Sequence, residues 1–237
     1  MLLEAGGGES LLSEVPSLLF GLFNSPSDWQ YKSQPTEDQI TSYEMKESSV
    51  NWPRGKALGG SSTINGMVYT RGNKKDYNLW QEQGNDGWSY EDVLPYFKKS
   101  EDNKIEKLAN SKYHSTGGYL TVEQSKGAPK LFDDVMDACK EVLEYNPDYN
   151  GEKQSGCVFY QSTTRNGQRC STAKAFLKTK RSNLHVSPFS HVHKVNIDPK
   201  TKRATGVVYK KGDKLVTVSA KKEVVLSAGA IGSPHVS

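Results

Sequence analysis

Residues 52–72 read Trp52-Pro53-Arg54-Gly55-Lys56-Ala57-Leu58-Gly59-Gly60-Ser61-Ser62-Thr63-Ile64-Asn65-Gly66-Met67-Val68-Tyr69-Thr70-Arg71-Gly72. Pro53 and Gly55 exclude a regular helix at the start of this stretch. Gly59 and Gly60 allow a tight turn and a close approach of the backbone to a ligand, because neither carries a Cβ. The next residues favour helix N-caps: Ser61, Ser62 and Thr63. Apolar residues then recur at helical spacing: Ile64, Met67 and Val68. The stretch predicts a glycine turn that leads into a helix.

A glycine turn at the start of a helix suits an anionic ligand such as a pyrophosphate. Free backbone N–H groups and the positive end of the helix dipole would both face the ligand. Arg54, Lys56 and Arg71 add positive charge nearby. The same pattern also describes an ordinary glycine turn before a buried helix, because a lone glycine motif has little specificity. Physical reasoning on this stretch alone leaves both interpretations open.

The sequence around the turn resembles a known family. From Gly55 to Asn78 the chain resembles the first signature of the glucose–methanol–choline (GMC) flavoprotein oxidoreductases. The positions that carry the resemblance are Gly59-Gly60-Ser61-Ser62, Asn65, Tyr69, Gly72 and Asn78. Residues 76–80 (Asp-Tyr-Asn-Leu-Trp) and 87–97 (Gly-Trp-Ser-Tyr-Glu-Asp-Val-Leu-Pro-Tyr-Phe) are similar to the glucose-dehydrogenase-like insect branch of that family.

The resemblance covers essentially the whole chain and implies its fold. It implies an α/β fold, in which a Rossmann-like FAD-binding domain of glutathione-reductase type is intertwined with a substrate domain that bears an antiparallel sheet. Residues 1–115 and 180–237 would be mainly FAD-binding pieces, and residues 116–179 mainly a substrate-domain piece. The G-x-G-x-x-G turn of such a domain would lie upstream of this chain. The family's second signature would begin at Gly229-Ala230-Ile231-Gly232-Ser233-Pro234, and Ser237 already departs from it.

The first residues supply a further candidate contact with the cofactor. Residues 1–7 predict the end of a buried parallel strand with an acid, Glu4, at its tip. In dinucleotide-binding folds such an acid hydrogen-bonds the ribose hydroxyls. The alternative is an exposed glutamate at the start of the chain. By resemblance Glu4 meets the ribose of FAD, the backbone of Val192 meets the adenine, and Gly229 lies near the phosphates. The residues that would contact flavin or pyrophosphate are Gly59, Gly60, Ser61, Asn65, Gly66, Met67 and Val68.

The resemblance also implies an activity. A family member oxidises a CH–OH group of an alcohol or a sugar such as glucose, a base removes the hydroxyl proton, and hydride moves to flavin N5. Quinone or oxygen would then accept the electrons. The family's catalytic histidine and its partner would lie beyond the second signature, so no histidine of this chain is assigned a catalytic role. The alternative is a non-catalytic remnant or interaction module that binds no flavin.

Composition narrows the other possibilities. The 237 residues carry a net charge of +4 with no basic block, so nucleic acid is not an expected partner. Residues 11–23 are apolar in patches, but Glu14, Pro16 and Gly21 interrupt them, so neither a membrane span nor a secretory signal is expected. The compartment stays open, although members of this branch are often secreted. His191 and His193 would share a strand face, but no acid or cysteine lies near them in sequence, so no metal site is expected.

Cysteines and local patterns complete the predictions. Three cysteines, an odd number, leave at least one thiol free or paired outside the chain, and all three are expected to act as small buried residues.

Residues 130–145 predict an amphipathic helix that packs on a core. Capping residues predict helices from Ser89 to Phe97, shortened by Pro95, and from Ser171. A strand is predicted near residues 29–32, within an irregular excursion over 6–49. Further strands are predicted near 157–161 and at a hairpin around Asn166-Gly167. The last part of the chain predicts strands at 185–186, 192–197, 205–210 and 215–219, and a fully buried strand at 224–226.

Overall fold

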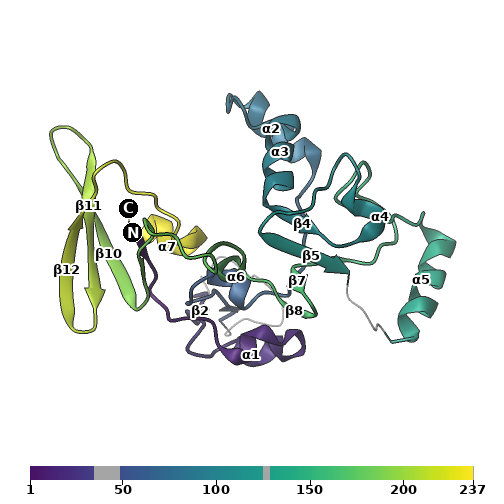
Figure 1. Ribbon diagram of the computed structural model, residues 1–237, viewed down its shortest axis with the longest axis horizontal. Coiled ribbons are helices and arrows are strands. Elements are labelled where there is room, and N and C mark those ends of the chain that lie inside the picture. The colour runs from purple at the N-terminus through teal and green to yellow at the C-terminus, as the bar shows by residue number, and fades with distance from the viewer. Residues whose placement is uncertain (35–48, 125–128, 237) are drawn as a thin grey trace. The chain divides into compact units, whose positions relative to one another are not determined.

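The computed structural model describes residues 1–34, 49–124 and 129–236, which form two compact units (Figure 1). Unit 1 comprises Met1–Ser13, Ser17–Ile64 and Thr179–Ser237, and unit 2 comprises Glu14–Pro16 and Asn65–Lys178. By packing, residues 65–115 therefore belong with residues 116–178. The assignment of residues to flavin and substrate pieces concerns function and stays a prediction. The predicted excursion over 6–49 lies partly outside the described residues, as does Ser237.

Unit 1 combines a three-stranded antiparallel sheet with two pairs of short strands. Its elements are β1 (Leu2–Leu3), η1 (Pro16–Leu22, from Ser17 onward), β2 (Tyr31–Lys32), β3 (Asn51–Trp52), η2 (Gly60–Thr63), β9 (Val186–Ser187), β10 (Ser190–Ile197), β11 (Ala204–Lys211), β12 (Lys214–Ser219) and α7 (Gly229–Val236), while α1 (Leu11–Glu14) ends at the unit boundary. β1 pairs with β9 in parallel, β2 with β3 antiparallel, and β10, β11 and β12 form the antiparallel sheet in that order. The strands predicted at 185–219 and near 29–32 are confirmed.

The buried strand predicted at 224–226 does not form. These residues are irregular, and Val225 is 75% exposed. An apolar run becomes a buried strand only where a neighbouring strand pairs with its backbone and two layers cover its faces. Among the described residues, no strand pairs with this segment.

Unit 2 combines helices with two small sheets. Its elements are α2 (Lys74–Glu82), α3 (Tyr90–Ser100), β4 (Glu101–Asn103), α4 (Glu106–Ala109), β5 (Leu120–Gln124), α5 (Leu131–Val142), β6 (Gln161–Ser162), β7 (Thr164–Arg165), β8 (Gln168–Arg169) and α6 (Thr172–Phe176). β5 lies between β4, which is parallel to it, and β6, which is antiparallel. β7 and β8 form the predicted hairpin. Together the two units make a mixed α/β chain with small sheets.

Local capping signals in unit 2 act as predicted. Ser89 and Asp92 form a capping box, and the hydroxyl of Ser171 accepts from the backbone N–H of Lys174. Asn166 and Gly167 both have positive φ, at 54° and 75°, as a tight two-residue hairpin turn requires. The helix after Ser89 is longer than predicted, because α3 passes through Pro95 and ends at Ser100. The proline therefore does not end α3.

Helix α5 forms where residues 130–145 predict it, but the prediction that it packs on a core is wrong. Met136 is its buried residue, whereas Leu131, Phe132, Val135 and Val142 are exposed. None of the described residues therefore covers this apolar face. No helix among the described residues is long and apolar enough to cross a membrane.

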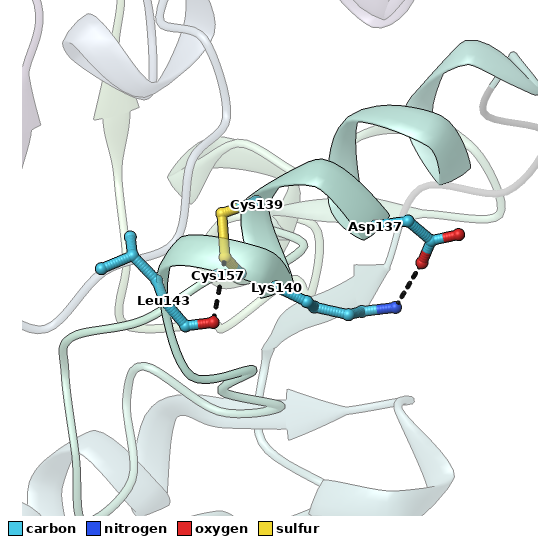
Figure 2. The surroundings of a disulfide bond; sticks show 5 residues. All are labelled: Asp137, Cys139, Lys140, Leu143 and Cys157. Carbon is cyan, nitrogen blue, oxygen red and sulfur yellow. Dashed lines mark hydrogen bonds and ion pairs between the residues drawn. A yellow bond between two sulfur atoms is a disulfide. The ribbon is translucent and has the colours of Figure 1, made fainter.

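A disulfide joins α5 to the loop that follows it (Figure 2). Cys139 bonds to Cys157 across 18 residues. The backbone N–H of Asn146 also donates to the carbonyl of Cys157, and that of Cys157 donates to the carbonyl of Glu144. The free thiol expected from the odd count belongs to Cys170, which is buried. The expectation that all three cysteines are simple buried residues is wrong for Cys139 and Cys157, because sequence spacing does not show which cysteines meet in space.

We expect the disulfide to contribute about 3 kcal/mol to the free energy of unfolding of unit 2, since it closes a loop of this size. Cys139→Ser or full reduction should lower the urea midpoint of unit 2. Thiol titration of the denatured, unreduced chain serves as the control and should find only Cys170 reactive. An unchanged midpoint in reductant would show that the bond does not stabilise this unit.

Candidate functional site

The glycine turn has the backbone conformation that the sequence predicts. Gly59 and Gly60 have φ values of 95° and 55°, a region that residues with a Cβ rarely adopt. The hydroxyl of Ser62 donates to the carbonyl of Gly59 at 2.5 Å, and that of Thr63 donates to the carbonyl of Leu58 at 3.0 Å. These hydroxyls therefore close the turn.

The helix predicted after the turn is absent. Residues 60–63 form only the short 3₁₀ helix η2, and Met67 has a φ of 59°, which ends any helical continuation. Serine and threonine hydroxyls that bond local backbone groups favour turns over helices. A four-residue 3₁₀ turn also supplies no helix dipole. The prediction that the positive end of a helix dipole attracts an anionic ligand at this turn is therefore wrong.

The segment that follows β1 lies beside residues 56–58, which lead into the turn. Gly7 pairs with Ala57 in a parallel bridge, and the N–H of Leu58 donates to the carbonyl of Gly7 at 2.8 Å. A Cβ on Gly6 would lie 1.8 Å from the carbonyl oxygen of Lys56, so only glycine fits there. The acidic strand end and the glycine turn, which are more than 50 residues apart in the chain, are thus brought together within unit 1.

Glu4 is half-buried at this strand end. Its Oε1 accepts from the N–H of Gly6 at 2.8 Å. Burial raises the pKa of Glu4, and hydrogen bonds from Gly6 and Ala5, with the charge of Lys56, partly oppose that rise. The carbonyl of Glu4 accepts from Ser190, the first residue of β10, at 2.8 Å. β10 carries Val192 and packs against α7, which begins at Gly229.

Two of the three predicted positive charges belong to this region. The Lys56 ammonium lies 4.7 Å from the centre of the Trp29 ring, and the Arg54 guanidinium lies 5.4 Å from that of Trp52. Arg71, the third, is not available to bind an anionic ligand at the turn. Its guanidinium is buried in unit 2, where Nη2 pairs with Glu101 at 2.9 Å.

The remaining predicted cofactor residues, 65–68, lie in unit 2 and are held by hydrogen bonds. Asn65 accepts from the N–H of Met67 at 3.0 Å, and the N–H of Thr163 donates to the carbonyl of Met67 at 2.8 Å. The buried Arg169 donates through Nη1 to the backbone carbonyl of Asn65 at 2.7 Å and to its side-chain oxygen at 2.9 Å. Sequence reasoning gave Arg169 no role, because a spacing of 104 residues carries no local signal. Gly66 lies within this held segment, and Val68 forms a bridge with Ser162.

A second residue missed from the sequence, Asp28, organises the approach to the glycine turn. Its carboxylate is 4% exposed and accepts from the backbone N–H groups of Asn24, Gln30 and Arg54 at 2.9–3.0 Å. The residue also bridges to Gly55. Asp28 therefore ties the segment around residue 28 to the start of the turn.

Asp28→Ala should lower the free energy of unfolding of unit 1 by about 2–5 kcal/mol, because it removes a buried acceptor that three backbone N–H groups share. Urea unfolding followed by tryptophan fluorescence measures this, since Trp29 is adjacent. Asp28→Asn keeps one carbonyl oxygen and should lose less. Asp213→Ala, at a fully exposed hairpin position, is the matched control. Equal stability of Asp28→Ala and Asp213→Ala would refute the anchoring role.

His191 and His193, on β10 of unit 1, lie near an aromatic ring. The rings of His191 and His193 lie 5.0 Å apart, and the ring of His191 packs against Trp29 at 5.3 Å. Burial first, and then the positive charges of His193, Lys56 and His235, lower the pKa of His191. Within residues 1–34, 49–124 and 129–236 there is no cluster of three or more metal-ligating side chains.

Comparison with known proteins gives the arrangement a context. A sequence model described as "GMC oxidoreductase" matches residues 3–236. The chain is 41% identical over 239 aligned residues to "Glucose dehydrogenase [FAD, quinone]" of Drosophila melanogaster, covering 100% of this chain and 38% of that protein. It is 37% identical to "Alcohol dehydrogenase [acceptor]" of Pseudomonas putida, covering 99% of this chain and 42% of that protein.

A solved structure shares the fold. Formate oxidase of Aspergillus oryzae RIB40 superposes with a TM-score of 0.85 at 25% identity, over 98% of this chain and 41% of that chain. The chain thus spans about two fifths of the length of these relatives.

Proposed function

The chain belongs to the GMC oxidoreductase family, and we propose that it carries part of the FAD site of an enzyme that oxidises the CH–OH group of an alcohol or a sugar such as glucose. The observation that carries this proposal is that the segment after β1, which begins at Glu4, pairs through Gly7 with Ala57 and Leu58, directly before the turn at Gly59 and Gly60. Relatives whose names specify glucose, with FAD and quinone, and alcohol, with an acceptor, support the substrate class.

The residues present fit a dinucleotide. A Cβ on Gly60 would meet no atom within 4 Å, so the turn has open space on that side for a ligand. The hydroxyl oxygen of Ser61 accepts from the N–H of Gly55 at 3.1 Å, which leaves its proton able to donate outward. A half-buried acid at a strand end is the group that binds ribose hydroxyls in such folds.

Each part has a distinct role in this proposal. Glu4 binds the ribose, the turn at Gly59–Ser61 and the segment 65–68 bind flavin and pyrophosphate, Val192 meets the adenine through its backbone, and Gly229 lies near the phosphates. Bound FAD would supply the hydride acceptor for alcohol oxidation. Arg169 and Asp28 would orient these segments without contacting the cofactor. Quinone or oxygen would reoxidise the flavin.

The disulfide supports an oxidising compartment, such as the extracellular space, as the site of action. Disulfides persist there and are rare in the cytosol. Trapping thiols with an alkylating reagent in intact cells tests this. We expect Cys139 and Cys157 to resist alkylation, and their full modification in the native protein would contradict the assignment.

The experiment that tests the function uses the protein translated from the complete transcript that contains this chain. Purified without added cofactor, it should show flavin absorbance. Anaerobic addition of glucose, choline or a simple primary alcohol should bleach that absorbance for at least one compound. A colourless protein that takes up no FAD would favour the non-catalytic alternative. Bound flavin that no alcohol or sugar reduces would contradict the proposed reaction.

A further inference from the structure

Unit 2 contains a buried cluster of four charged side chains. Arg71 pairs with Glu101 at 2.9 Å, Glu101 with His114 at 2.9 Å, and His114 with Asp148 at 3.0 Å. The side chains of Arg71, Glu101 and His114 are at most 2% exposed, and that of Asp148 is 13% exposed. A buried charge is stable only when it is paired and hydrogen-bonded. The cluster contains two carboxylates, so it is neutral only if both Arg71 and His114 are cations.

The ring of His114 faces a carboxylate from each of its nitrogens. Nδ1 lies 2.9 Å from Oε1 of Glu101, and Nε2 lies 3.0 Å from Oδ2 of Asp148. A carboxylate only accepts hydrogen bonds, so each nitrogen must carry a proton to make a favourable contact. The amide nitrogen of Asn103 donates one of its two protons to Glu101 at 3.2 Å and lies 3.1 Å from Nδ1, so Nδ1 has both this amide and the Glu101 carboxylate, at 2.9 Å, as neighbours. In a neutral ring with Nδ1 unprotonated, a lone pair would face the Glu101 carboxylate.

Hydrogen bonds connect the cluster to the backbone of Tyr69, next to the segment 65–68 that is predicted to contact flavin. Asp148 accepts from the side chain of Gln161 at 2.9 Å and from the N–H of Asn150 at 3.1 Å. The amide of Asn150 and the hydroxyl of Tyr149 donate to the carbonyl of Tyr69 at 3.0 and 2.6 Å. The N–H of Tyr69 donates to the carbonyl of Gln161 at 2.8 Å. Tyr69 follows Val68 directly, so the cluster fixes one end of the segment 65–68.

We propose that Glu101 and Asp148 hold His114 as a doubly protonated cation, and that the neutral cluster it completes positions the segment 65–69 for flavin contact. The link to flavin rests on the proposed function. In this role His114 is a positioning residue, and it cannot act as a base because both nitrogens already carry protons.

The pH dependence follows from the groups around His114. Burial by itself lowers the pKa of His114, but the hydrogen bonds and charges of Asp148 and Glu101 outweigh it and raise that pKa. Burial raises the pKa of Asp148, but the hydrogen bonds from His114, Gln161 and Asn150 and the charge of His114 together outweigh it and lower that pKa. Besides Arg71 within the cluster, the ionisable groups that interact with its members are the hydroxyls of Tyr69, Tyr90 and Tyr149. The contribution of His114 is complete below its ordinary pKa of 6.5 and is lost as pH rises through its raised value. That of Asp148 is complete above its ordinary 3.8 and is lost as pH falls through its lowered value.

NMR of the 237-residue chain tests the ionisation directly. We expect both imidazole nitrogens of His114 to be protonated at pH 6.5 and to titrate only above it. Asp148→Asn removes one carboxylate and should lower the pKa of His114, whereas His185→Asn, at an exposed position, should leave it unchanged. A single-proton tautomer of His114 at pH 6.5 would overturn the proposal, as would a pKa insensitive to Asp148→Asn.

Amide hydrogen exchange in the same samples tests the positioning role. After correction for the intrinsic effect of pH, exchange of the Tyr69 amide should rise at least about tenfold as His114 loses its proton, because an uncompensated buried charge is strongly destabilising. Amides in the β11–β12 ladder of unit 1 should not share this step, and His114→Asn should abolish it. An unchanged Tyr69 amide would refute the positioning role.

A flavin readout separates this proposal from the proposed function. In the protein from the complete transcript, FAD affinity should fall over the pH range in which His114 titrates, and His114→Asn should remove that dependence. Flavin that binds with no such step would overturn the positioning role alone. A protein that binds no flavin at any pH would refute both the proposed function and the link to flavin, while the NMR result would still decide the charge of His114.

Discussion

Gly60→Val should abolish FAD retention by the protein from the complete transcript. Gly60 has a φ of 55° and open space where its Cβ would stand. A branched side chain there would fill the space that the cofactor is proposed to occupy, and it would also strain the turn by about 1–2 kcal/mol. Flavin content after gel filtration measures the effect, and we expect none to remain.

A matched substitution separates the loss of space for the cofactor from the strain in the turn. Gly212, in the turn between β11 and β12 of the same unit, has a φ of 56° and equally open space. Gly212→Val therefore carries similar strain without touching the proposed site and should retain flavin. Gly60→Asn, which tolerates positive φ but adds bulk, should lose it. If Gly60→Val kept the flavin content of the parent, the turn would not be a cofactor contact.

The 237-residue chain should show no alcohol-dependent dye reduction even with saturating FAD, whereas the protein from the complete transcript should be active. The GMC resemblance places the catalytic base outside these residues, and loss of a general base typically costs about 10²–10⁴-fold in rate. The cofactor would also be weakly held, because the sequence of this chain contains no G-x-G-x-x-G turn.

The comparison requires both proteins in one assay with glucose, choline and simple alcohols. The expected rate for the chain is indistinguishable from the enzyme-free blank. Activity within about tenfold of the complete protein would place the base inside these residues. His114 would not be the first candidate, because both of its ring nitrogens face carboxylates at about 3 Å.

Features with a local cause could be predicted from the sequence. The Asn166-Gly167 hairpin depends on two adjacent residues that tolerate positive φ, and the capping box at Ser89 depends on a partner three residues away. The strands of the β10–β12 sheet alternate and are joined by clear turns, so their order follows from their sequence. The glycine turn at Gly59 was predictable for the same reason.

Features that depend on distant partners could not be predicted. The apolar residues after Ser61 have helical spacing, yet hydrogen bonds from Thr163 and Arg169, about 100 residues away, hold that segment in another conformation. Arg71 looks like a free cation until Glu101 is brought beside it. The amphipathic pattern of α5 predicts the helix correctly, but a pattern does not show whether another element covers its apolar face.

A crystal structure of the protein from the complete transcript with FAD tests the central claim most directly. We predict that the ribose hydroxyls lie within hydrogen-bonding distance of Glu4, that the cofactor contacts the backbone at Gly60 and Ser61, and that the segment 65–68 faces the flavin. FAD bound away from Glu4 and the glycine turn, or no FAD in crystals grown with saturating cofactor, would contradict it.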